Sequence, residues 1–212
     1  MKKNKLIQSA AVLLVLISIS CRSPKLSSAT NFKIEDAEVA LTDGTTQKGN
    51  AEYPPNLGDS KLHLKINGEK IKLEKEQITS LTYNISGGKL VYENLKIYKN
   101  KDKNKIRKEK QLLALTIAGK VSLYSARGSS WQQQGNTQVP VYYTIYYCKR
   151  ATEEAATLIH MDMGAINQNA LFRPFAQKYF EDDTEIASKI KNRDFTYKNL
   201  FEVVSLYNSK HP

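Results

Sequence analysis

Few side chains in this sequence have the types and the spacing that chemistry requires. The chain contains two cysteines, Cys21 and Cys148, and three histidines, His63, His160 and His211. No histidine stands in an H-E-x-x-H or H-x-E pattern, and the cysteines form no C-x-x-C pair. The sequence therefore predicts no metal and no cofactor.

His160 and Asp162, in the sequence His-Met-Asp, come closest to a ligand pair. A metal site needs three or four ligands, so two on one strand are better explained as polar residues on a strand face. No serine stands in a G-x-S-x-G elbow, and no glycine-rich phosphate loop is present. Scattered carboxylates do not identify an acid–base pair. We therefore predict no catalytic residue.

The N-terminal segment has the layout of a secretory signal. Three lysines within the first five residues precede an apolar run, residues 6–19. A run of about 14 residues is too short to span a bilayer comfortably, because a spanning helix needs about 20. Residues 1–20 are therefore predicted to be a signal peptide.

The apolar run stops at Ser20, directly before Cys21. Residues 18–21 resemble the bacterial lipobox, although Ser18 stands where Leu is usual. The resemblance implies that the Cys21 thiol takes a diacylglyceryl group, and that cleavage frees its amine for a further acyl chain. Several acyl chains hold a protein stably on a membrane where one does not. The alternatives are an ordinary signal peptide that leaves Cys21 as a thiol, or an uncleaved anchor.

Acylation of Cys21 leaves Cys148 without a partner in the chain, so no intramolecular disulfide is expected. Cys148 lies in the strand-like sequence VPVYYTIYYCKR. A catalytic thiolate needs a helix N-terminus or a cation to depress its pKa, and no helix N-terminus is predicted beside it. We therefore interpret Cys148 as a half-buried strand residue.

The balance of charge is basic, with 32 Lys and Arg against 21 Asp and Glu and a net charge of +11. Such a balance favours anionic neighbours, here an anionic lipid or polysaccharide. We expect no nucleic-acid partner, because the sequence contains no recognition-helix, zinc-finger or aromatic RNA-binding motif and the chain carries an export signal.

The basic residues concentrate in KIYKNKDKNKIRKEK, residues 96–110. Each basic residue near an anionic membrane surface contributes about 1 kcal/mol of binding. The sequence thus predicts a contact with lipid headgroups through four lysines of this loop: Lys99, Lys101, Lys103 and Lys105. The alternative is a solvated loop before a helix.

Tyrosines gather on one predicted strand. Tyr142 and Tyr146 alternate with Tyr143 and Tyr147, so each face of the strand carries two rings, and Trp131 lies in the preceding polar loop. One face must belong to the core. The other is either an aromatic platform for sugar or peptide or a surface for cross-strand packing.

The pattern along the chain predicts a tether at residues 21–35, a β-rich domain at 36–165 and a helical segment at 166–212. Asn67-Gly68, between two alternating runs, predicts a β-hairpin over residues 61–74. Further alternating runs indicate an antiparallel meander with one buried face. Charged residues followed by apolar ones at helical spacing predict a short helix over residues 107–119.

The last fifty residues place apolar side chains three or four positions apart, as amphipathic helices do. Ile186 and Ile190 form one predicted core stripe, and Leu200 begins another that continues to Tyr207. Pro174 is expected in the first turn of its helix. A helical layer packed on the sheet would bury both stripes.

Three stretches resemble a group of uncharacterised, often exported proteins of Bacteroidota. They are GKVSLY at 119–124, YYTIYY at 142–147, and DDTEIASKIKNRDFTYKNLFEVVSLYN at 182–208. The resemblance covers about residues 38–208 and marks no catalytic residue. It implies a β-rich N-terminal part, a helical C-terminal end and no assigned activity. It also implies a looser lipobox, as is usual in that phylum.

These features predict an α+β fold: an antiparallel meander, small sandwich or barrel-like sheet with an inserted short helix and a C-terminal helical layer. They predict a membrane-anchored envelope lipoprotein that binds or scaffolds an envelope protein, an anionic lipid or a polysaccharide. The residues after Cys21 lack the acidic cluster that resembles a surface-export signal in this phylum, so an outer-membrane protein facing the periplasm is expected. The alternative function is a periplasmic enzyme of the hydrolase type.

Overall fold

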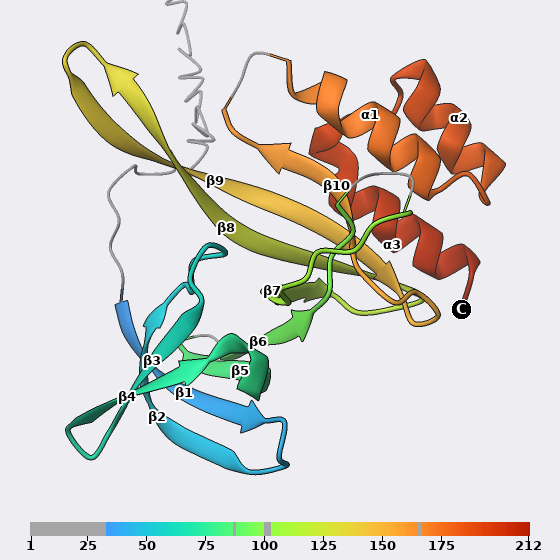
Figure 1. Cartoon of the computed structure of the whole chain (residues 1–212). Helices are drawn as coiled ribbons and strands as arrows, with labels where there is room; N and C mark the ends of the chain where they lie inside the picture. Colours follow the sequence, from blue (N-terminus) through green and yellow to red (C-terminus); the bar gives the residue numbers. More distant parts are fainter. Residues whose placement is uncertain (1–32, 87, 100–102, 165–166) are drawn as a thin grey trace, which may run out of the picture. The chain divides into compact units, whose positions relative to one another are not determined.

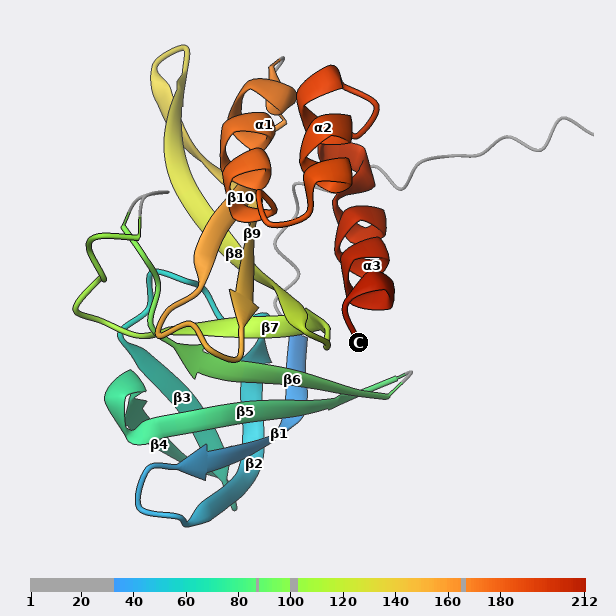
Figure 2. The same ribbon diagram turned by 90° about the vertical axis from the view of Figure 1, so that its right-hand side faces the viewer.

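An antiparallel sheet and a C-terminal helical layer form the part of the chain that the computed structural model describes, residues 33–86, 88–99, 103–164 and 167–212 (Figures 1 and 2). The strands are β1 (Lys33–Leu41), β2 (Thr46–Tyr53), β3 (Lys61–Ile66), β4 (Glu69–Glu74), β5 (Ile78–Ile85), β6 (Gly88–Leu95), β7 (Gln111–Ile117), β8 (Val121–Gln134), β9 (Thr137–Arg150) and β10 (Thr157–Asp162). The helices are α1 (Gln168–Tyr179), α2 (Thr184–Asn192) and α3 (Leu200–Lys210), with 3₁₀ turns η1 (Lys75–Gln77) and η2 (Tyr197–Asn199).

The ten strands form one open sheet in the order β10-β9-β8-β7-β6-β5-β1-β2-β3-β4. The predicted α+β class is confirmed, and within the described residues the sheet does not close into a barrel. The sheet begins at Lys33, inside the segment predicted to be the tether. No helix in the described ranges is long and apolar enough to cross a membrane.

The predicted hairpin over residues 61–74 is present as β3 and β4. Ile66 pairs with Glu69, which leaves Asn67 and Gly68 as a two-residue turn. Their φ angles are 50° and 91°, the positive values that a type I′ turn requires. Local sequence chemistry therefore sufficed to predict this element.

The predicted helix over residues 107–119 is wrong, because strand β7 occupies most of that range. Leu112, Leu113 and Ala114 are all buried, since β7 lies between β6 and β8 and both of its faces are covered. A strand buried on both faces has a continuous apolar run, which periodicity alone does not distinguish from a helix. Pairing with neighbouring strands decided the structure.

Two apolar cores lie on opposite faces of β8 and β9. On one face Leu123 and Cys148 pack against the three helices. On the other face Tyr124 and Tyr147 pack with Ile97 and the loops between strands. A third core fills the part of the sheet formed by β1 to β7.

The C-terminal helices cover β8 to β10, as expected from their apolar stripes (Figure 2). Ile186, Ile190, Leu200 and Tyr207 are buried in the first of these cores. Pro174, however, lies inside α1 rather than in its first turn, because α1 begins at Gln168. The helix thus starts six residues before the proline, more than one and a half turns.

The hairpin of β8 and β9 extends beyond the rest of the sheet. β8 pairs with β9 from Val121 to Gln134, whereas β7 reaches only Ser125 of β8 and β10 reaches only Thr144 of β9. The remaining two-stranded ribbon, residues 128–143, is named the arm (Figure 1). Trp131 therefore lies on a strand and not in the loop predicted for it.

Candidate binding cleft

A cleft of about 360 Å³ lies at the base of the arm. This volume falls in the range of small-ligand sites, roughly 300–1,000 Å³. Five segments of the chain line it, and their residues are Asn56, Leu57, Gly58, Asp59, Ser60, Lys75, Glu76, Arg107, Glu109, Lys110, Gln111, Gly128, Ser129 and Tyr143.

Lys75 is held in the cleft by the 3₁₀ turn that it begins. The backbone N–H of Glu74 donates to Gln77 Oε1, which closes this turn. Asn94, which is buried, donates from Nδ2 to the carbonyl oxygens of Lys75 and Ile78 at 2.6 and 2.8 Å. The backbone at Lys75 is therefore fixed from both sides.

The Lys75 side chain is almost fully buried, with 5% of its surface exposed. Its Nζ donates to the carbonyl oxygen of Leu57 at 3.0 Å and to Gln111 Oε1 at 3.3 Å. Burial lowers the pKa of the ammonium from its usual value, while the carboxylates of Asp59 and Glu76 oppose the shift. Both acceptors are neutral, so among the described residues no carboxylate is hydrogen-bonded to this ammonium.

The wall toward the arm depends on a glycine. The ring of Tyr143 lies over Gly128, and a Cβ atom at Gly128 would come within 2.4 Å of that ring. Leu57 N donates to the Arg127 carbonyl oxygen at 3.0 Å, and this bond ties the loop over residues 54–60 to β8. An aromatic ring and a loop tied to β8 thus form this wall.

Charges of both signs surround the cleft. Asp59, Glu76 and Glu109 contribute carboxylates, and Arg107 and Lys110 contribute cations beside Lys75. The sequence did not predict a cleft, because these residues come from separate segments that only the folded sheet brings together. Arg107, Glu109 and Lys110 belong to the basic segment 96–110, for which the sequence predicted a contact with headgroups instead.

The four lysines predicted to bind headgroups have different environments. Lys99 and Lys105 are exposed, and Lys99 N donates to the Lys105 carbonyl oxygen at 2.7 Å, which closes the loop at its base. Lys103 instead contacts the Glu153 carboxylate, and its Nζ lies 4.7 Å from the centre of the Tyr179 ring. Lys101, like the predicted lipidation site Cys21, lies outside the described residues.

Glu153 belongs to an ion network that joins β9 to the helices. Arg150 donates to Asp182 Oδ1 at 2.8 Å and to the Tyr179 carbonyl oxygen at 3.1 Å. Glu153 accepts from the Arg150 backbone N–H and from the Tyr179 hydroxyl, both at 2.8 Å.

Cys148 is fully buried and unpaired, and burial raises the pKa of its thiol far above the usual value. This environment is the reverse of that of a reactive cysteine.

His160 faces the helices because β10 contains a β-bulge between Leu158 and His160. The bulge interrupts the alternation of side chains between the two faces of the strand, so Ile159 and His160 are both buried. The imidazole lies between Tyr146 and Tyr197, with ring centres 6.3 and 5.2 Å away. Neither ring nitrogen has a hydrogen-bond partner among the described residues.

Asp162, two residues after His160, contacts the first residue of α1. Asp162 Oδ1 accepts from Gln168 Nε2 at 2.8 Å. In the described part of the chain, no group of three His, Cys, Asp or Glu side chains is placed to hold a metal ion.

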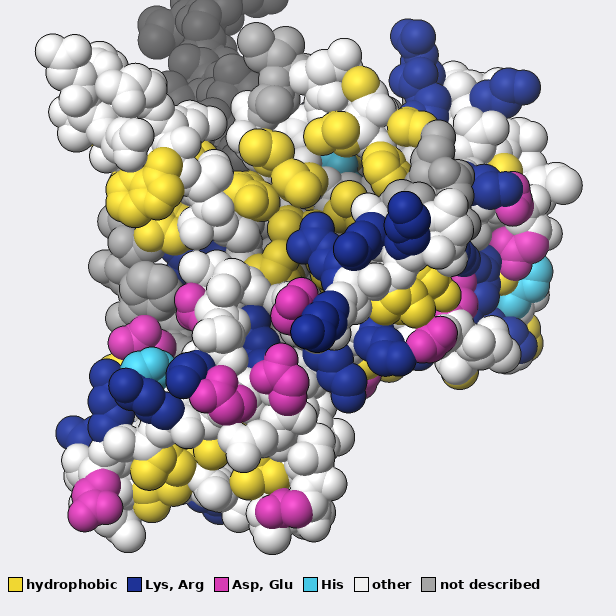
Figure 3. Space-filling view, viewed as in Figure 1, with side chains coloured by type: hydrophobic (Ala, Val, Ile, Leu, Met, Phe, Trp, Pro, Cys, Tyr) yellow, Lys and Arg dark blue, Asp and Glu magenta, His cyan; other side chains and the backbone are white. Residues whose placement is uncertain are grey.

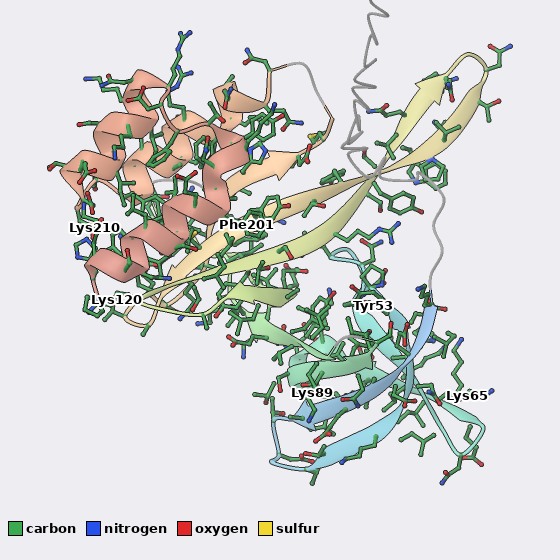
Figure 4. All side chains as sticks on the ribbon, turned by 180° about the vertical axis from the view of Figure 1, so that it is seen from behind. Tyr53, Lys65, Lys89, Lys120, Phe201 and Lys210 are labelled. Atoms are coloured by element: carbon green, nitrogen blue, oxygen red, sulfur yellow. The ribbon has the colours of Figure 1, made fainter. Side chains whose placement is uncertain are left out.

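The tyrosines of β9 mainly serve the cores. Tyr147 is buried on one face, and Tyr146 packs on the other against His160 and Phe201, the second of which is labelled near the start of α3 in Figure 4. Cross-strand packing therefore uses both faces. Tyr142 is the exception, because Arg127 lies over its ring at 4.1 Å on the arm.

Comparison of the chain with protein-family models, with curated proteins and with solved structures finds no match. The resemblance to exported proteins of Bacteroidota therefore stays a prediction. Function must instead be inferred from the geometry of the cleft and of the arm.

Stability should depend on pH through His160. Burial lowers the pKa of this imidazole, and the charge of Asp162 and the amide of Gln168 oppose the shift only in part. The unfolded chain therefore binds a proton more readily, so stability should fall as the pH drops below about 6.5, by at most about 1.36 kcal/mol per pH unit. Urea unfolding between pH 7.5 and 5 measures this slope. His160→Phe should make the slope shallower. If the free energy of unfolding depends on pH equally in the two proteins, His160 is not the cause of the slope.

Proposed function

We propose that this protein is a membrane-anchored lipoprotein of the bacterial cell envelope, and that it binds a partner without catalysing a reaction. The observation that carries the proposal is the cleft built around Lys75. Its ammonium is buried, is held by two neutral acceptors, and lies in a concavity large enough for a ligand. A fixed donor in a partly apolar cleft orients a ligand by hydrogen bonding.

The partner is a polypeptide segment of another envelope protein. Carboxylates of Asp59 and Glu76 and cations of Arg107 and Lys110 stand around the same opening. Figure 3 shows Lys and Arg side chains interspersed with Asp and Glu below the arm. A surface of mixed sign complements a segment that carries both charges, whereas a uniformly anionic polymer would meet repulsion from the carboxylates.

The anchor is Cys21, and the domain faces the periplasm from the outer membrane. Residues 22–32 separate Cys21 from the first strand at Lys33. Eleven residues reach at most about 40 Å when fully extended, at about 3.3–3.6 Å per residue. Within that reach Lys99 and Lys105 can contact the headgroups, where basic side chains are attracted to anionic lipid.

A second candidate function is a hydrolase of the periplasm. The observation in its favour is that the carboxylates of Asp59, Glu76 and Glu109 line one cleft, and glycoside hydrolysis uses a pair of carboxyl groups. Turnover of an envelope glycan that Glu76→Gln abolishes without loss of binding would favour this candidate over binding.

Lipidation at Cys21 predicts the outcome of metabolic labelling. A radiolabelled fatty acid should enter the wild-type chain in cells and should not enter Cys21→Ser, because the serine hydroxyl does not replace the thiol in thioether formation. Cys148→Ser is the matched control and should keep full labelling, since this thiol is buried. Equal labelling of wild type and Cys21→Ser would refute the anchor.

Ligand capture at the cleft can be measured in the native envelope. A photo-crosslinking amino acid in place of Lys110 should give an adduct of defined mass, and Lys75→Met in the same chain should reduce its yield by about tenfold, as expected for loss of a charged hydrogen bond. The control probe replaces Lys198, an exposed residue of η2 in the helical layer. An adduct that forms equally at Lys198, or that ignores Lys75→Met, would exclude the cleft as the binding site.

Headgroup contact can be tested with vesicles of phosphatidylglycerol and phosphatidylcholine. A soluble form without residues 1–26 should bind them at low salt, and Lys99→Gln with Lys105→Gln should weaken binding by about thirtyfold, from about 1 kcal/mol for each lysine. Lys103 is left intact because it contacts Glu153.

The matched control removes two charges elsewhere, Lys89→Gln with Lys120→Gln, two exposed residues labelled in Figure 4. Binding should be retained in the control and should weaken with salt in every variant, because exposed charges are screened beyond about 8 Å at physiological ionic strength. Equal losses of vesicle binding in the two double variants would show that residues 96–110 form a solvated loop that does not contact headgroups.

A further inference from the structure

The arm presents a sheet edge without a strand partner in the described residues. β7 pairs with β8 only as far as Ser125. Beyond it, the loop over residues 54–60 pairs with Arg127, and Asn56 Nδ2 donates to Ser129 Oγ at 3.4 Å. From residue 130 to the end of β8 at Gln134, no described strand lies along this edge.

Backbone groups at alternate residues of this edge point outward. The Arg127 carbonyl oxygen accepts from Leu57 N, so it points away from β9. In an antiparallel ladder the same direction recurs every second residue, at Ser129, Trp131 and Gln133. Trp131 pairs with Pro140, which has no backbone N–H to donate to β8. This agrees with a pair in which the backbone groups of Trp131 point away from β9.

The other sheet edges are protected. β4 has the sequence EKIKLE, whose charges discourage pairing, and β10 is packed against α1. The β9 edge of the arm is interrupted by Pro140. The β8 edge has neither a charge nor a proline from Gly128 to Gln134, and Figure 3 shows no charged side chain at the end of the arm.

We propose that the β8 edge of the arm pairs with the same edge of a second copy of this chain, antiparallel and about a two-fold axis at Trp131. Trp131 then pairs with Trp131 of the second copy, and Ser129 pairs with Gln133. Each pair exchanges two backbone hydrogen bonds, and the two arms form a four-stranded sheet. This interaction goes beyond the proposed ligand cleft, with which its paired residues share only Ser129.

A second copy fits because the edge is self-complementary. Hydroxyl and carboxamide groups both donate and accept, so Ser129 and Gln133 can face one another across the axis. The Trp131 side chain is 70% exposed, and pairing places it beside an identical ring. No charged residue lies between Arg127 and Lys149, so two otherwise basic chains can approach here without repulsion.

The loop over residues 54–60 sets the register. It occupies the edge at Arg127, so a partner strand cannot run past that residue. Pairing that uses Ser129, Trp131 and Gln133 together is then the longest two-fold arrangement available. In that arrangement the Cα atoms of the two residues at position 131 lie about 5.5 Å apart, within the range of about 4.4–6.8 Å that a disulfide spans.

Oxidation of a single cysteine tests the pairing in the native membrane with the full chain. Trp131→Cys should form a disulfide-linked dimer of twice the chain mass under a mild oxidant. Gln138→Cys, on the opposite edge of the arm, should form at least about tenfold less disulfide-linked dimer. In the paired arms, three strand spacings of about 4.8 Å would separate its two cysteines. The wild-type chain controls for the native cysteines.

Proline variants distinguish the two edges. In the Trp131→Cys chain, Gln133→Pro removes an outward N–H and should lower the dimer yield by about tenfold, whereas Gln138→Pro should leave it unchanged. Circular dichroism confirms that each variant is folded. Loss of the dimer in both proline variants, a dimer that persists in Gln133→Pro, no dimer with Trp131→Cys, or an adduct of another mass would each overturn the proposal.

Discussion

The ladder between β8 and β9 is the interaction on which the rest of the structure depends. It runs without interruption from the Val121–Arg150 pair to the Gln134–Thr137 pair. Its inner half has a core on each face, with the helices on one and the loops after β6 on the other. Its outer half contacts these cores only at Tyr143, which packs against the second. A two-stranded ribbon is marginal alone, so the arm takes its order from the buried half to which it is continuous.

The ion network at the inner end of this ladder fixes the helical layer. Arg150 ends β9 and binds Asp182, whose Oδ2 accepts from the Tyr207 hydroxyl of α3 at 2.7 Å. Removal of one member of a partly buried network leaves the others unpaired, which is more destabilising than loss of the whole group. The network therefore specifies where the helices sit on β9, beyond what apolar burial alone requires.

Elements marked by residue types at a fixed local spacing were predictable from the sequence. Elements that depend on pairing with strands distant in the sequence were not. The Asn67-Gly68 turn and the stripe of Ile186 and Ile190 follow from residue types at fixed spacing. β7 was predicted to be a helix because a run buried on both faces has no distinctive period. The part of the arm before the predicted strand VPVYYTIYYCKR was predicted to be a loop, although Gly135-Asn136 is a recognisable hairpin turn, with Gly135 at a φ of 60°. The cleft joins separate segments, and no local pattern marks it.

Two buried basic groups, Lys75 and His160, show why burial alone does not indicate a site. His160 has no hydrogen-bond partner in the described residues, is enclosed by Tyr146, Phe172 and Tyr197, and does not line the cleft at the base of the arm. Its ring therefore serves mainly to fill space between β10 and the helices. Lys75 has acceptors that orient its ammonium at the wall of an open cleft. A buried polar side chain without a hydrogen-bond partner in a closed core lowers the stability of the fold and supplies no function. A buried charged side chain at the wall of an open cleft is instead characteristic of a functional site.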